Sequence, residues 1–482
     1  MQIGRKDVAW NFAATFMRIA SGLIVLPLVL RLLPSQEVGL WNIFLTIGSI
    51  ATLLDFGFSN AFARNITYIF SGVKELKAEG FVAVDQNDPS VDYGLLRSVI
   101  RAMRRYYVIL AAIFLLLFIV ASPFYLHTVL EKYRGNTHVV WTAWFTYGAL
   151  VAYQLYTYYY GALLTGRGYI KKNMQIIVVA QSARIVITAI FLLYGLGLMS
   201  LVIGMFISDI VNRTLSYLAF YDKETSHRIK AGKAIPVREI MKIMTPNAVK
   251  IGLTSLGGFL INKAVILIAP LYLSLSDIAS YGTTKQFIDL IVSLGAIWFS
   301  TFYPKITQYR VSKDYEGVKR LYIKSQLSLL ITFIICGLGL IYFGPLAMDL
   351  IRSKTHLLPS EMMAVFLLTI YFESNQGMSR NTLLTKNEVP FAKATIISGF
   401  ISVFILYLFL AYAKIGMWGM ILAPAFVQAS YQNWKWPYQV IIELKLTKKD
   451  YKDVIHSLID TYLKRVGNNK NTIHEIQMES KK

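Results

Sequence analysis

The run Tyr106–Leu126 reads YYVILAAIFLLLFIVASPFYL and contains no charged side chain. A helix needs about 20 mostly apolar residues to cross the hydrocarbon core of a bilayer. In a soluble amphipathic helix, by contrast, polar residues recur every few positions on the solvent face. Tyr106–Leu126 therefore predicts a membrane-spanning helix, and the chain contains further runs of similar length.

The composition of the whole chain points to the same class. The 482 residues are 55% hydrophobic and only 16% charged, although the net charge is +22. A basic nucleic-acid binder or a disordered chain would carry more charge and fewer apolar residues, so no nucleic-acid partner is expected. The single Cys336 excludes a disulfide-rich secreted domain. A multi-pass membrane protein remains.

Runs of this length predict an all-α polytopic membrane protein with twelve transmembrane helices. No signal peptide is predicted, because the first apolar run has helix length and lacks a small-residue cleavage site. The approximate spans are Val8–Leu33, Val38–Phe58, Tyr106–Leu126, Val139–Leu164, Met174–Leu196, Met199–Tyr221, Ile243–Leu271, Ile278–Tyr303, Leu321–Leu350, Met362–Leu384, Phe391–Ala413 and Gly416–Ile442.

The basic residues predict the orientation of these spans. Of the 49 Lys and Arg, 36 lie on the side of the N-terminus, six lie on the opposite side and seven lie within spans. Because basic residues concentrate in cytoplasmic loops, both termini are expected in the cytoplasm. An even number of spans satisfies this orientation, as twelve does. Most of the positive charge therefore reflects the orientation of the spans in the membrane and gives no information about the substrate.

Short similar segments occur in the same order in the two halves of the chain, such as Leu163-Leu164-Thr165 and Leu383-Leu384-Thr385. Because both halves start in the cytoplasm, we expect a parallel repeat of two six-helix lobes with a central cavity on the substrate path. The predicted division is 1–221 for the N-terminal lobe, 222–242 for a cytoplasmic linker, 243–442 for the C-terminal lobe and 443–482 for a charged cytoplasmic tail.

The cytoplasmic segment 59–105 is predicted to be amphipathic and helical. Its apolar residues Phe62, Ile66, Ile69 and Val73 recur at helical spacing, with basic residues between them. Two interpretations remain open: a helix that lies on the membrane surface, and an ordinary helix packed on the bundle.

Polar stripes inside the spans indicate a lumen. A charge that faces lipid costs about 2.5–3.5 kcal/mol, so these groups should face protein or water. Because Arg and Lys bind phosphate oxygens, a lumen lined by bases would attract a phosphorylated anion. The candidate bases are Arg18, Arg184, Lys250 and Lys263, and the candidate polar lining residues are Asn11, Thr15, Gln181, Asn247 and Thr254.

Structural pairing is the alternative for these charges. Three of the bases, Arg18, Arg184 and Lys250, can pair across helices with Asp55 or Glu373. The same two acids, together with Asp289, are candidates for coupling to a proton or sodium gradient.

Charges four positions apart on one helix are predicted to pair along that helix. The two such pairs are Asp209 with Arg213 and Lys285 with Asp289. Lys263 lies off the polar stripe of its helix unless Gly257-Gly258 bends that helix.

The tyrosine run Tyr153–Tyr160 also allows two interpretations. Tyrosine rings stack on sugars in a glycan path, and they equally form belts at the membrane interface. Elsewhere, no Walker A loop and no Cys/His cluster occurs, so neither ATP hydrolysis nor a metal or cofactor is expected. The predicted extracytoplasmic links are short, which disfavours an enzyme.

Several short stretches near the N-terminus carry a family resemblance. They are Gly4-Arg5-Lys6-Asp7-Val8, the run LPSQEVGLW at 33–41, the run LDFGF at 54–58, and Ala63-Arg64-Asn65. The sequence resembles Wzx-type flippases of polysaccharide repeat units (O-antigen or capsule), similar to those of Bacteroides-like bacteria. This family belongs to the multidrug/oligosaccharidyl-lipid/polysaccharide (MOP) exporter superfamily. The motifs cover mainly the first 80 residues, and the topology covers the whole chain.

The resemblance implies a MATE-like, two-lobed fold with a central cationic cavity, and it makes Arg18 the candidate base on the first helix. It implies export of an undecaprenyl-diphosphate-linked oligosaccharide from the cytoplasmic to the periplasmic leaflet of the bacterial inner membrane, by alternating access. It further implies a monomer in contact with membrane lipid and with the polysaccharide polymerase machinery. Two alternatives stay open: an ion-coupled, MATE-like small-molecule antiporter, and a membrane glycan polymerase or ligase.

Overall fold

The computed structural model describes residues 10, 17, 24–76, 90–232, 235–386, 389–458 and 460, and for residues 60, 246–248, 250, 251 and 311 it describes the backbone alone. Within these ranges helices are joined by short turns and loops, and there is no strand. The all-α fold class predicted from the apolar runs is therefore confirmed.

The elements follow one another with short connections. Residues 24–32 are helical and precede the first labelled helix. The labelled helices are α2 (Ser35–Leu54), α3 (Phe58–Phe70), α4 (Tyr93–Leu130), α5 (Thr137–Thr157), α6 (Tyr159–Gly166), α7 (Ile170–Leu193), α8 (Leu198–Phe220), α9 (Lys223–Ala231), α10 (Val237–Asn262), α11 (Ala264–Ile268), η1 (Ala269–Leu271), α12 (Leu275–Val311), α13 (Tyr315–Leu350), α14 (Ser360–Leu384), α15 (Ala392–Tyr407), η2 (Leu408–Tyr412), α16 (Met417–Val427), η3 (Gln428–Gln432) and α17 (Asn433–Leu444).

Seven helices of the described residues are long and apolar enough to cross a membrane, or eight if the bent pair Gly252–Asn262 and Ala264–Leu271 forms one span. Each predicted span from Val38 onward coincides with one helix or with a broken run of helices. The fourth span, for example, is α5 followed by α6, because the helix breaks at Tyr158. The first span, Val8–Leu33, lies largely outside the described residues, and the count of twelve stays a prediction.

The chain forms two compact units. Unit 1 comprises Met1–Thr284, Gly344–Leu358 and Thr395–Pro424, and unit 2 comprises Lys285–Phe343, Pro359–Ala394 and Ala425–Lys482. The segment predicted as a linker, 222–242, contains α9 and the start of α10. The six-plus-six division of the spans stays a prediction.

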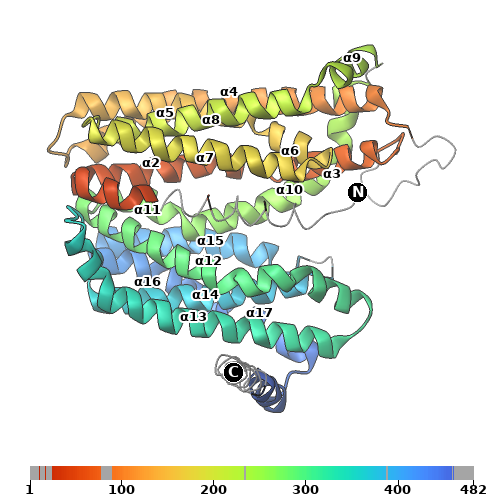
Figure 1. Ribbon diagram of the computed structural model, residues 1–482. Coiled ribbons are helices and arrows are strands. Elements are labelled where there is room, and N and C mark those ends of the chain that lie inside the picture. Colours follow the sequence, from red (N-terminus) through yellow and green to blue (C-terminus); the bar gives the residue numbers. More distant parts are fainter. Residues whose placement is uncertain are drawn as a thin grey trace, which may run out of the picture. The chain divides into compact units, whose positions relative to one another are not determined.

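In unit 1, helices α2, α4, α5, α7 and α8 run side by side (Figure 1). Aromatic side chains fill the space between α2 and α5, where the rings of Phe44 and Trp144 meet edge to face with centroids 5.0 Å apart. Gly48 permits this approach, because a Cβ at that position would lie 2.2 Å from the hydroxyl of Tyr147. Close packing of this kind stabilises helices in lipid, where apolar burial supplies no driving force.

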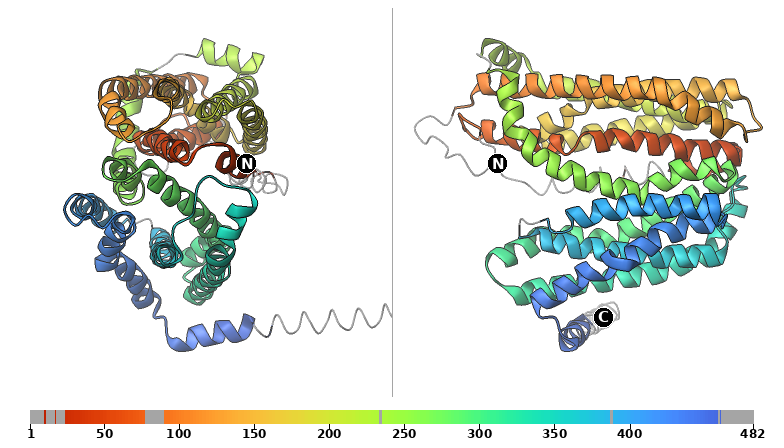
Figure 2. Two further views of the ribbon diagram at one scale, coloured as in Figure 1. Left: turned by 90° about the vertical axis from the view of Figure 1, so that its left-hand side faces the viewer. Right: turned by 180° about the vertical axis from the view of Figure 1, so that it is seen from behind.

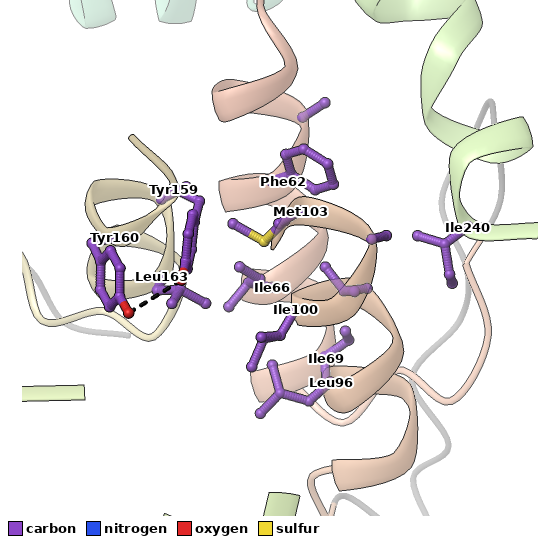
Figure 3. Close-up of a cluster of buried hydrophobic side chains, with 14 of the residues drawn as sticks. Phe62, Ile66, Ile69, Leu96, Ile100, Met103, Tyr159, Tyr160, Leu163 and Ile240 are labelled. Atoms are coloured by element: carbon purple, nitrogen blue, oxygen red, sulfur yellow. Dashed lines mark hydrogen bonds between the residues drawn. The ribbon is translucent and has the colours of Figure 1, made fainter. Parts of the chain in front are cut away.

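Helix α3 is packed on the bundle and does not lie on a membrane surface with its apolar face. Phe62, Ile66 and Ile69 are fully buried in a cluster that also contains side chains of α4 and α6 (Figure 3). The apolar stripe predicted within 59–105 therefore contacts protein. The interpretation as an ordinary packed helix is confirmed for α3, and residues from Tyr93 onward belong to α4.

Unit 2 is built around α13, α14 and α17. Helices α14 and α17 pack along each other, and a short helical segment at 448–458 follows α17 (Figure 2). Polar side chains inside this unit bond to one another: Gln326 donates to Asn375 at 2.9 Å and accepts from the Tyr451 hydroxyl at 2.7 Å. This network satisfies its own members and leaves little capacity for a ligand.

Candidate functional site

The candidate site is a polar cavity of about 470 Å³ inside unit 1. This volume falls in the range of small-ligand sites, roughly 300–1,000 Å³. Polar groups within membrane-spanning helices cost free energy to bury, so a cavity lined by them is a candidate functional site. Its described lining residues come from α2, α3, α5, α6, α7 and α8, and the polar ones are Thr52, Ser59, Gln154, Thr157, Tyr158, Tyr160, Thr165, Asn173, Asp209 and Asn212.

Asp209 is the acidic group of the cavity. The amide nitrogen of Gln154, on α5, donates to a carboxylate oxygen of Asp209, on α8, at 2.6 Å. Helices α5 and α8 pack against each other, which brings the two side chains together. A hydrogen bond to a carboxylate in a low-dielectric interior is stronger than one between neutral groups. This bond therefore holds both side chains in a defined orientation at the cavity wall.

Arg213 makes a different contact from the one its spacing predicts. Its guanidinium carbon lies 3.6 Å from the centroid of the Tyr160 ring and 5.5 Å from that of Tyr217. No ion pair joins Asp209 and Arg213 among the described residues, so the predicted pair along the helix is wrong. The physical reason is that α5 and α6 supply better partners, an amide for the acid and an aromatic face for the base.

The predicted lumen residue Arg184 lies near this cavity. It is half-buried on α7, and its charge interacts with Tyr147 and Asp209. Helices α7 and α8 approach closely because Gly204 leaves room for the Thr188 hydroxyl, which is 1.9 Å from where a Cβ would be. Gln181, one turn before Arg184, has a buried side-chain oxygen without a hydrogen-bond partner among the described residues.

Asp55 is buried at the junction of α2 and α3. Its carboxylate accepts a hydrogen bond from the Ser59 amide at 3.1 Å and another from the Tyr107 hydroxyl. Acceptance of a backbone N–H near the start of α3 is a helix-capping contact. Ser59 also lines the polar cavity, so Asp55 adjoins the site through that residue.

The candidates on α10 are only partly described. Asn247 and Lys250 lie in α10, but their side chains are outside the described residues, and Asn11, Thr15 and Arg18 are outside them altogether. Thr254 is half-buried.

Lys263 occupies the break between α10 and α11. The two helical pieces on either side of it are bent by 54°. The bend considered at Gly257-Gly258 therefore lies at Lys263 itself, where the backbone leaves helical geometry at φ −122°. A break of this kind frees backbone groups inside a span, which membrane proteins accept where protein or water satisfies them.

In unit 2, the predicted pair of Lys285 and Asp289 is confirmed, with nitrogen and oxygen 2.8 Å apart. The remaining candidate acid, Glu373, is half-buried on α14, and its charge interacts with Arg380 two turns later. Over the described ranges, no group of three or more His, Cys, Asp or Glu side chains is placed to hold a metal ion.

Sequence reasoning missed Gln154, Asn173 and Asn212 as candidates. A signal for Asn212 was present, because Asp209, Asn212 and Ser216 share one helical face. This stripe combines a carboxylate, an amide and a hydroxyl, and it contains no basic residue.

Comparison with solved structures identifies the fold. The chain superimposes on an inward-facing multidrug resistance MATE family transporter of the MOP superfamily with a TM-score of 0.63 and 15% identity, covering 90% of this chain and 96% of that one. It superimposes on the lipid II flippase MurJ, in an inward closed conformation, with a TM-score of 0.64 and 14% identity, covering 95% and 93%. A MATE transporter in the bent conformation gives a TM-score of 0.52 at 14% identity, covering 93% and 96%. No family model matches the sequence, and no curated protein does so. The chain is a multi-pass membrane protein with the fold of these MOP superfamily transporters.

Proposed function

We propose that this protein is a flippase for undecaprenyl-diphosphate-linked oligosaccharides. It moves repeat units for O-antigen or capsule assembly from the cytoplasmic to the periplasmic leaflet of the bacterial inner membrane. The proposal combines the fold, which is shared with a lipid II flippase and with MATE transporters, with the Wzx-like N-terminal sequence. The observation that carries it is the excess of bases within the predicted spans, seven against four acids.

The bases within the spans favour a negatively charged substrate. In a chain of this fold, Arg18, Arg184, Lys250 and Lys263 would hold the diphosphate, because guanidinium and ammonium groups bind phosphate oxygens. The polyprenyl tail would stay in lipid, where its apolar surface is already solvated. The protein would alternate between two states by binding the cargo more tightly in one of them.

Transport against a gradient needs an energy source. Proton or sodium coupling through Asp55, Asp289 or Glu373 is part of the proposal, with no organic cofactor. Both termini would lie in the cytoplasm, and the protein would act as a monomer beside the polysaccharide polymerase machinery.

A small-molecule antiporter is the second candidate function. The specific observation in its favour is the carboxylate of Asp209 in the wall of a polar cavity, since a buried acid suits a cationic substrate or coupling ion. The charge of Arg184 acts against this, because it interacts with Asp209 and lowers the attraction for a cation.

Charge reversal tests the flippase proposal. Arg18→Glu and Lys250→Glu, produced at wild-type level in a strain that lacks the chromosomal copy, should abolish surface polysaccharide and cause the lipid-linked oligosaccharide to accumulate in the cytoplasmic leaflet. Arg31→Glu, near the predicted external end of the first span, is the matched control and should retain surface polysaccharide. Normal surface polysaccharide in both lumen variants, without accumulation of the intermediate, would refute the mechanism.

A further inference from the structure

The polar cavity of unit 1 has the chemistry of a carbohydrate site. Its wall carries side chains that can both donate and accept hydrogen bonds, which is what sugar hydroxyls require. Gln154, Asn173 and Asn212 supply three carboxamides, and Asp209 supplies a carboxylate. These groups come from α5, α7 and α8, so they reach the cavity from different directions.

Two tyrosines complete the wall. Tyr158 and Tyr160 both line the cavity. The Tyr160 ring packs between the guanidinium of Arg213, 3.6 Å from its centroid, and the ring of Tyr159, whose centroid is 4.4 Å away. The hydroxyls of the two tyrosines are hydrogen-bonded at 3.1 Å (Figure 3). Tyr158 is 40% exposed, so its ring is the one that can offer an apolar surface to the C–H face of a sugar. Tyr159 and Tyr160 are buried, so for them the membrane-belt interpretation does not hold.

The charge balance selects a neutral ligand. Among the described lining residues, Asp209 is the one acidic side chain, and neither Lys nor Arg occurs. The Asp209 carboxylate is already bonded to Gln154 and interacts with the charge of Arg184, so its attraction for a cation is reduced. An anion would find no base in this wall. A neutral molecule with many hydroxyl groups needs neither a free acid nor a base, and it can bond to the carboxamides of the wall.

We propose that this cavity binds a sugar residue of the transported oligosaccharide, because its described lining contains none of the bases proposed to hold the diphosphate. The inference rests on the proposed flippase function and names the part of the cargo that unit 1 recognises. Gln154, Asn212 and Asn173 bind the sugar hydroxyls, and the Tyr158 ring contacts the sugar face. The bonded pair of Gln154 and Asp209 is preorganised, so little ordering is needed when the ligand arrives.

Ligand-observed NMR tests binding directly. The full-length protein in lipid nanodiscs is mixed in turn with methyl glycosides of glucose, galactose, mannose, rhamnose, N-acetylglucosamine and N-acetylgalactosamine, and saturation transfer to the ring protons is measured. At least one sugar should receive saturation in wild type. The signal should fall at least fivefold in Gln154→Leu, Asn212→Leu and the milder Asn173→Ala. Thr146→Val, an exposed α5 change whose hydroxyl bonds to its own helix, should keep it. Absence of transfer from all six sugars would overturn the proposal.

A cation probe separates the second candidate. Tetraphenylphosphonium binding that depends on Asp209, without sugar binding, would overturn the proposal and favour an antiporter. The midpoint of thermal unfolding of each variant, read from its helical circular dichroism, shows whether the variant is folded.

Flipping in cells distinguishes failure of this inference from failure of the proposed function. The inference predicts that Asn173→Ala and Gln154→Leu reduce surface polysaccharide by at least fivefold. If both variants retain the wild-type amount while Arg18→Glu abolishes it, the cavity is not a sugar site and the flippase function stands. If neither class of variant changes surface polysaccharide, the flippase function itself fails.

Discussion

Glu443 is predicted to be the residue of unit 2 whose neutralisation costs the most stability. Its two carboxylate oxygens each contact a different base: Arg310 of α12 at 2.6 Å and Lys386, just after α14, at 2.6 Å. Arg310 also donates to the Thr385 hydroxyl at 3.3 Å. One acid on α17 therefore ties together the ends of two other helices, and Glu443→Gln would leave two bases facing a neutral amide.

The burial of Arg310, Glu443 and Lys386 determines how much stability the Glu443→Gln change should cost. Their exposed fractions are 9% for Arg310, 18% for Glu443 and 35% for Lys386. Loss of one partner from a fully buried ion pair costs about 3–5 kcal/mol, whereas an exposed pair contributes about 0–1 kcal/mol. Because Lys386 reaches solvent and is screened by it, an intermediate loss of about 2–3 kcal/mol in the free energy of unfolding is expected.

The single cysteine provides the assay. Cys336 is half-buried on α13, in the same unit, so a fluorogenic maleimide reports when this unit opens during a thermal ramp. Glu443→Gln should lower the midpoint by several degrees. The control is Glu316→Gln, which breaks the ion pair of Glu316 with Lys319. The Glu316 side chain is 76% exposed, so this change should shift the midpoint little. Equal midpoints for Glu443→Gln and wild type would show that the contacts of Glu443 with Arg310 and Lys386 contribute nothing to stability, and would refute this prediction.

Two further predictions concern packing and acid stability. Gly257→Ala should destabilise the protein by about 1–3 kcal/mol, because its Cβ would lie 2.6 Å from the backbone of Thr395. Gly258→Ala meets nothing within 4 Å and should be neutral or stabilising, as measured by thermal unfolding followed by circular dichroism. The amide of Thr225 donates to Asp222 at 2.7 Å and holds the pKa of that carboxyl below its usual range. Because the folded-state pKa is the lower one, this stabilisation is complete above the unfolded-state pKa, about 3.9, and is lost as the pH falls through the folded value. Asp222→Asn should therefore flatten the acid side of the plot of unfolding midpoint against pH, and an unchanged slope would contradict the assignment.

The helices of this protein could be predicted from local sequence. Long apolar runs such as Tyr106–Leu126 must become helices in a bilayer, because each backbone group has to be satisfied within the run itself. Local spacing also found the pair of Lys285 and Asp289, since a partner one turn away is within reach whatever the rest of the chain does.

The same spacing failed for Asp209 and Arg213, and tertiary packing explains why. Once α5 and α6 lie beside α8, Asp209 bonds to Gln154 and Arg213 covers the ring of Tyr160. A local rule gives the distance to a neighbour on the same helix, but it cannot rank that neighbour against one on another helix.

The sequence by itself determined the class of protein, the course of its apolar spans and the concentration of its charge on one predicted side, because these depend on length and composition. Only the tertiary structure decided where α10 bends, which partners the buried charges take, and that Gln154, Asn173 and Asn212 converge on one cavity. Convergence depends on how helices are rotated and packed against each other. That arrangement is set by close contacts such as Gly48 with Tyr147 and Gly204 with Thr188, which no periodicity within one helix contains.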